Sequence, residues 1–135
     1  MGGIKIDLAR LAPDFLRALF VQEFRQSDST APLDSQKSIV TALAYQNGME
    51  FILPPPDALA VPFKLVVAFP DNDGDSCTVK PRDINNNPNT FEIDSFTFTA
   101  RAQSFLLWWI QPPDQPDGGS WTLVANNGAT VNPIV

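Results

Sequence analysis

The chain has 135 residues, of which 44% are hydrophobic, so its composition suits one domain with its own core and excludes a disordered protein. Its net charge is −6, and its Lys and Arg residues form no cluster, which disfavours a nucleic-acid partner. The absence of histidine excludes Ser-His-Asp triads, Cys-His pairs and imidazole-bound zinc. We therefore expect no cofactor and no metal.

No stretch of the sequence is long and apolar enough for a membrane. The longest uninterrupted apolar run, residues 105–110, is far shorter than the roughly 20 residues that span a bilayer. Lys5, Asp7 and Arg10 interrupt the N-terminal segment, which leaves no apolar core for a signal peptide. The sequence predicts a soluble protein that is made in a cytoplasm and has no membrane partner.

Residues 1–38 are expected to form an arm, a helix and a linker ahead of a β-domain at residues 39–135. The arm, residues 1–10, alternates apolar and polar side chains as a short strand does. The linker, residues 27–38, is polar and contains Pro32, which favours a boundary at this point.

Residues 13–26 give the one convincing helix signal. Pro13 suits the first helical position, and Asp14 is favourable near the positive end of the helix dipole. The apolar stripe of this predicted helix consists of Phe15, Leu16, Leu19, Phe20 and Phe24. Such a stripe packs on its own domain or anchors a partner, and both alternatives remain open.

From residue 39 onward the pattern predicts seven or eight short strands with turns between them and no helix. Asn47-Gly48 lies between two β-prone runs and predicts a tight hairpin, because both turn positions favour positive φ. Residues 63–69 alternate a strongly apolar face with a mildly apolar one, as in a sandwich strand. The predicted fold is mainly β, an antiparallel β-sandwich or jelly-roll with one N-terminal amphipathic helix.

Two segments raise the question of a reactive or metal site. Cys77 is expected to be a buried strand residue, because a catalytic thiol needs a base beside it, commonly histidine. The run Asp71–Asp75 resembles a calcium loop, but its glycine is fourth instead of sixth and Arg82 occupies the twelfth position. We expect a solvated hairpin turn there.

Paired carboxylates could run a glycosidase, and the candidates are Glu50, Asp83, Glu92 and Asp94. Their spacing does not place any two of them in one cleft, and most surface acids are simply solvated. A non-enzymatic role with no catalytic residue is therefore expected.

All three tryptophans lie between residues 96 and 125. Trp108 and Trp109 are adjacent, so in a strand they must point to opposite sides. One of them is expected in the core, and the other at a subunit seam or on a ligand platform.

Five segments of the β-domain follow one another in a recognisable order: Ile52–Pro56, Phe63–Phe69, Thr78–Pro81, Phe96–Thr99 and Ser120–Asn126. Together, over residues 49–127, they resemble a β-module that is common among structural proteins of tailed-bacteriophage virions. The resemblance covers the β-domain but not the N-terminal arm and helix, and its motifs are structural, not catalytic.

The resemblance implies a homo-oligomer, with a trimer favoured over a dimer, made in the host cytoplasm and located on the capsid surface of a virion. The short chain favours a cement or decoration protein that bridges major capsid subunits. The apolar stripe of the predicted helix would then anchor the partner, and Trp108 and Trp109 would mark the oligomer seam. The alternatives are a tail-fibre or head-fibre adaptor, or a receptor-binding module that recognises glycans.

Overall fold

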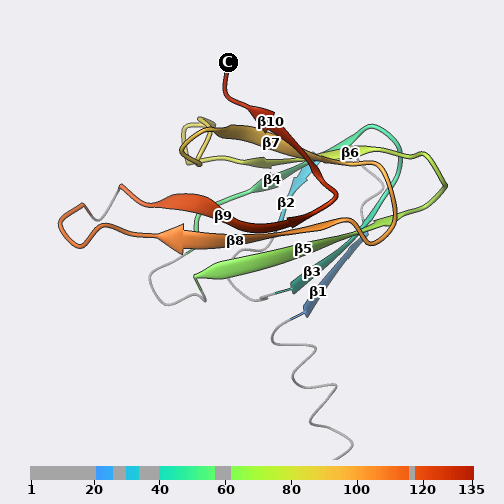
Figure 1. Cartoon of the computed structure of the whole chain (residues 1–135), viewed down its shortest axis with the longest axis horizontal. Helices are drawn as coiled ribbons and strands as arrows, with labels where there is room; N and C mark the ends of the chain where they lie inside the picture. Colours follow the sequence, from blue (N-terminus) through green and yellow to red (C-terminus); the bar gives the residue numbers. More distant parts are fainter. Residues whose placement is uncertain (1–20, 26–29, 34–39, 57–61, 116–117) are drawn as a thin grey trace, which may run out of the picture.

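The computed structural model describes residues 21–25, 30–33, 40–56, 62–115 and 118–135, which form ten strands in two mixed sheets (Figure 1). Sheet A has the strand order β1 (Val21–Arg25), β3 (Val40–Tyr45), β5 (Phe63–Pro70), β8 (Ser104–Ile110) and β9 (Ser120–Asn127). Sheet B has the order β10 (Thr130–Pro133), β7 (Ile93–Phe98), β6 (Cys77–Pro81), β4 (Met49–Leu53) and β2 (Thr30–Pro32). The mainly β prediction is confirmed, and none of the described residues belongs to a helix that could cross a membrane.

The first six strands alternate between the two sheets. Odd-numbered strands lie in sheet A and even-numbered strands in sheet B, so β1, β3 and β5 run parallel, as do β2, β4 and β6. The later strands β7, β8, β9 and β10 pair antiparallel with their neighbours. The antiparallel prediction is therefore wrong for the first half of the fold and right for the second half.

The hairpin predicted at Asn47-Gly48 is wrong, because β3 and β4 lie in different sheets. The turn is a β-arch, a connection that carries the chain from one sheet to the other. Gly48 has a φ of 82°, the left-handed conformation that glycine adopts without strain. The arch between β5 and β6 stacks on it, since Gly48 N donates to Ser76 O at 2.8 Å and Ser76 N donates to Asn47 Oδ1 at 2.9 Å.

The helix predicted over residues 13–26 is wrong in its last part, where Val21–Arg25 forms β1 at the edge of sheet A. Phe24 pairs there with Leu43 of β3. Pairing with an adjacent strand has overridden the local helical spacing, as tertiary context often does. Likewise, β2 lies within the predicted linker and pairs with β4. The other four residues of the predicted stripe, at positions 15, 16, 19 and 20, lie outside the described residues.

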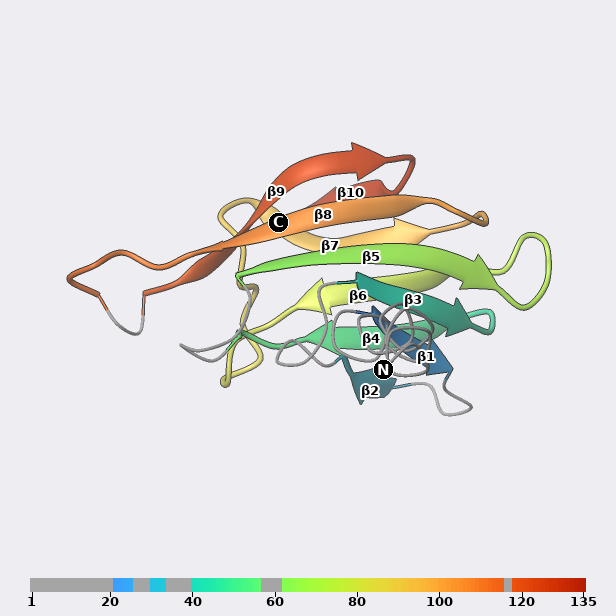
Figure 2. The same ribbon diagram turned by 90° about the horizontal axis from the view of Figure 1, so that it is seen from below.

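Side chains from both sheets fill one hydrophobic core, and Figure 2 shows β5 of sheet A in front of β6 of sheet B. Phe105 of β8 stacks on Phe96 and on Phe98 of β7, with ring centroids 4.1 and 5.4 Å away. These contacts cross from sheet to sheet. The other members of the core that are at most 1% exposed are Leu33, Leu43, Tyr45, Phe51, Leu53, Val66, Ala68, Cys77, Val79, Leu107 and Trp121.

Replacing Phe105 with alanine is expected to lower the free energy of unfolding by about 3–5 kcal/mol, because the ring is buried between the two sheets. Urea denaturation followed by tryptophan fluorescence measures the loss. The control is Ile84→Ala, whose side chain is 96% exposed and whose effect should stay within about 0.5 kcal/mol. Equal losses in the two variants would contradict the shared core.

Candidate interaction surfaces

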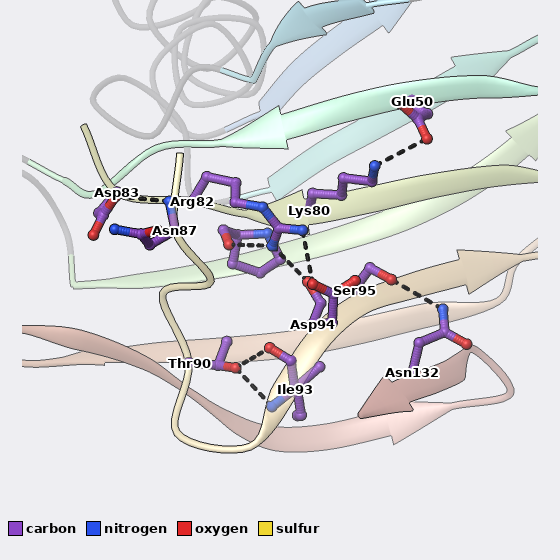
Figure 3. Close-up of polar contacts among 11 residues, drawn as sticks. Glu50, Lys80, Arg82, Asp83, Asn87, Thr90, Ile93, Asp94, Ser95 and Asn132 are labelled. Carbon is purple, nitrogen blue, oxygen red and sulfur yellow. Dashed lines mark hydrogen bonds and ion pairs between the residues drawn. The ribbon is translucent and has the colours of Figure 1, made fainter. Parts of the chain in front are cut away.

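The outer face of sheet B is polar, and its side chains bond to one another across adjacent strands (Figure 3). Lys80 Nζ lies 3.0 Å from Glu50 Oε1, which joins β6 to β4. Asn132 Nδ2 donates to Ser95 Oγ at 3.1 Å and to Thr97 Oγ1 at 2.9 Å, which joins β10 to β7. This face therefore uses its polar groups to hold its own strands together.

Arg82 follows β6 and is only 8% exposed. Its Nη2 donates to Asp94 Oδ1 at 2.9 Å, and its Nη1 donates to the carbonyl oxygens of Asp94 at 2.7 Å and of Pro81 at 2.9 Å (Figure 3). No local pattern predicted this pair, because the two residues are 12 positions apart and only the pairing of β6 with β7 brings them together. The guanidinium of Arg82 thus links the end of β6 to β7.

Three of the four carboxylates considered for glycoside hydrolysis have structural partners. Glu50 and Asp94 form ion pairs with Lys80 and Arg82. Asp83 caps its own loop, since its Oδ1 accepts from the backbone N–H groups of the residues at positions 85 and 87, at 2.8 and 2.9 Å. The fourth, at position 92, lies at the rim of a cavity. The structure brings no two of these acids together through a contact in the described residues.

That cavity has a volume of about 180 Å³ and lies between the segment before β7 and the start of β9. Its lining is mostly apolar and consists of Thr90, Phe91, Glu92, Ile93, Trp121, Thr122 and Leu123. Trp121 Nε1 and Thr122 Oγ1 are buried and have no hydrogen-bond partner among the described residues. Because both atoms are shut off from solvent, they offer no accessible hydrogen bond to a molecule in the cavity.

The segment Asp71–Asp75 forms the arch between β5 and β6, and not a hairpin. It is largely exposed, and Asn72 N donates to Asp75 Oδ2 at 3.2 Å. Across the described part of the chain, no group of three or more His, Cys, Asp and Glu side chains could hold a metal ion.

Cys77 is a buried strand residue, as predicted, with 1% of its surface exposed. Burial raises the pKa of its thiol to about 12, although a hydrogen bond with the backbone of Phe98 acts in the opposite direction. Burial also raises the pKa of Tyr45 to about 12, and the nearby Cys77 and Asp75 act in the same direction. Both groups therefore remain protonated at neutral pH.

Trp108 and Trp109 point to opposite sides of β8, as predicted. Trp109 packs against the core and meets Trp121 edge to face, with ring centroids 5.3 Å apart. Trp108 is 45% exposed and stacks on Phe63 at 5.4 Å. The predicted seam stays a prediction, but of the two residues only Trp108 offers a substantial exposed surface to a partner.

Strand β5 turns its strongly apolar face outward. Val66 and Lys64 are both 0% exposed and lie on the core side, whereas Phe63, Leu65 and Val67 lie on the outer side. The alternation was visible in the sequence, but it did not say which face would be inside. The surface that results, called here the outer face of sheet A, consists of Val40, Ala42, Ala44, Phe63, Leu65, Val67, Phe69, Leu106, Trp108 and Ile110.

The outer face of sheet A differs sharply in charge from that of sheet B. None of the outward positions of β3, β5 and β8 holds Asp, Glu, Lys or Arg. At the end of β5, the guanidinium of Arg101 lies over the ring of Phe69, 5.9 Å from its centroid. The charge is thus at the border of this face, and the face itself is apolar.

Comparisons of the chain with models of protein families, with curated proteins and with solved structures found no match. The resemblance of residues 49–127 to a bacteriophage virion module thus stays a prediction from the sequence.

The protein is expected to lose stability as the pH rises from about 9 toward 12. The pKa values of Cys77 and Tyr45 rise to about 12 from 9.0 and 10.0, so the unfolded chain releases both protons before the folded chain does. Their stabilising contribution is complete below the ordinary pKa values and disappears as the pH passes through the raised ones. Cys77→Val should make the alkaline decline of the thermal midpoint shallower, and identical declines would refute this assignment.

Replacing Arg82 with methionine should lower the free energy of unfolding by about 1–3 kcal/mol, because buried acceptors of Pro81 and Asp94 lose their donor. The matched control is Glu50→Gln, which weakens an ion pair whose carboxylate side chain is 50% exposed. That change should amount to less than about 1 kcal/mol. Urea denaturation of both variants checks the order, and a larger loss for Glu50→Gln would contradict it.

Proposed function

We propose that this chain is a non-enzymatic structural protein of a bacteriophage virion, a cement or decoration protein that bridges and stabilises major capsid subunits. One observation carries the proposal. The outer face of sheet A is apolar and uncharged over β3, β5 and β8, whereas the charged groups of sheet B bond within the fold. Large apolar surfaces of this kind suit lasting contact with protein.

The finer description of the fold belongs to the same proposal. Two sheets with a shared core support a β-sandwich. A jelly-roll is antiparallel, so the parallel pairs of the first six strands favour a sandwich in the broader sense. The amphipathic helix is proposed for residues 13–20, ahead of β1, where Phe15, Leu16, Leu19 and Phe20 would anchor the partner.

In this proposal the protein acts mechanically. A homo-oligomer, with a trimer favoured, occupies a symmetry position of the capsid surface and contacts several major capsid subunits at once. Burial of apolar surface contributes about 25 cal/mol per Å² at each contact. Because the contacts belong to one oligomer, they reinforce one another and raise the overall affinity.

A second candidate function rests on the exposed tryptophan. Trp108 and Phe63 present a stacked aromatic pair at the surface, and aromatic faces suit the apolar faces of sugar rings. This pair would serve a receptor-binding module, or an adaptor in a tail fibre or head fibre. Tryptophan fluorescence that stays unchanged across a glycan panel would count against this candidate.

A variant that lacks residues 1–20 is expected to fold and yet fail to bind phage shells. The deletion ends ahead of Val21, because β1 pairs with β3 and belongs to sheet A. Co-sedimentation of the purified protein with heads that lack it measures binding, and circular dichroism checks the fold. The control is the full chain with Ile84→Glu, an exposed loop substitution that should bind normally.

Binding by the truncated variant at the level of the full chain would contradict the anchoring role of the N-terminal segment. The position of gold-labelled protein on virions, seen by electron microscopy, separates the two candidates. Label on the head supports the cement protein, and label on the tail supports the fibre adaptor.

A further inference from the structure

We infer that the outer face of sheet A is the seam between copies of this chain, with sheet A of one copy packed against sheet A of another. This inference rests on the proposed homo-oligomer and goes beyond it by naming the surface in contact. Packing of this face on the same face of another copy closes as a two-fold dimer, so the inference selects the dimer and not the trimer. It also changes the predicted seam at Trp108 and Trp109: of these two residues, only Trp108 belongs to the outer face of sheet A, because Trp109 packs against the core.

The orientation of β5 is the first reason. Phe63, Leu65 and Val67 point away from the core, while Lys64 is fully buried. A shift of one residue in register would exchange the two faces of the strand, placing the larger apolar side chains in the core and the lysine in water. The observed register becomes favourable when a second layer buries the outer face as well.

The apolar surface also continues from strand to strand. The register places Leu65 of β5 beside Val40 of β3 and Leu106 of β8, and Phe63 beside Trp108. With strands about 4.8 Å apart and about 3.3 Å per residue, the three strands of this face, at about six residues each, cover roughly 300 Å² in flat projection. Apolar patches of this order on single chains are often functional, and a standard interface buries about 800 Å² of accessible surface per partner.

A second copy is the occupant that fits this face best. The chain has a net charge of −6, so two copies repel each other wherever their acidic groups meet. The outward positions of β3, β5 and β8 hold no charge, so contact here keeps the acidic groups of the two copies apart. The apolar face of one sheet is also a natural complement to that of another, with the two layers about 10 Å apart.

The β9 edge of sheet A is poorly suited to pairing with a strand of another copy. β9 is an edge strand, and its pairing with β8 shifts between Leu106 and Leu107, which marks a β-bulge. Val124, opposite this shift, is 56% exposed. Bulges twist an edge strand and hinder the addition of a strand from another chain. Pairing of copies through the β9 edge is therefore disfavoured.

Two identical substitutions at two exposed isoleucines test the seam. Ile110 lies on the outer face of sheet A and is 45% exposed, whereas Ile84 lies in a loop and is 96% exposed. Light scattering after size-exclusion chromatography gives the mass in solution. The wild type and Ile84→Glu should show a multiple of the 14.8 kDa chain, and Ile110→Glu should fall to the single-chain mass.

A wild type with the mass of one chain at every concentration would overturn the inference. It would also be overturned if the full chain were a monomer and associated only after deletion of residues 1–20, because those residues would then be what covers the face. An Ile110→Glu variant that keeps the wild-type mass would also overturn it. If Ile110→Glu does not fold, Trp108→Ser takes its place with the same expected mass. Shell co-sedimentation is scored separately, so a seam elsewhere leaves the proposed cement function standing.

Discussion

The stack of Phe105 on Phe96 and Phe98 is the interaction on which the rest of the fold depends. It joins β8 of sheet A to β7 of sheet B at centroid distances of 4.1 and 5.4 Å. The first six strands alternate between the sheets, so each arch places consecutive strands in opposite layers. Such a chain gains little from local pairing, and its stability comes from the apolar contact between the layers.

The two outer faces of this double layer have opposite chemistry. Sheet B directs polar groups outward and satisfies them across its strands, as Asn132 does with Ser95 and Thr97. Sheet A directs Phe63, Leu65 and other apolar side chains outward. The polar outer face of sheet B is stable in contact with water, whereas the outer face of sheet A still has apolar surface to bury. That asymmetry is the physical basis for assigning contact with protein to sheet A.

Most of the side chains that could take part in a reaction or bind a metal have a structural role. The guanidinium of Arg82 holds Asp94, and the carboxylate of Asp83 caps its own loop. Cys77 is buried with a raised pKa and stays a thiol. The sequence suggested Asp94 as a candidate, but it could not reveal Arg82 as its partner, because only the pairing of β6 with β7 brings the two residues together.

By itself, the sequence determined the β-rich class, seven or eight strands after residue 39, the burial of Cys77 and the opposite orientations of Trp108 and Trp109. These features follow from side-chain alternation and turn residues, which act locally. Only the tertiary structure decided that Asn47-Gly48 makes an arch, that Val21–Arg25 is a strand, and which face of β5 is inside. Gly48 has a positive φ in the arch, as it would in a hairpin, and alternation looks the same from either side of a strand. Pairing between distant segments decides between these alternatives.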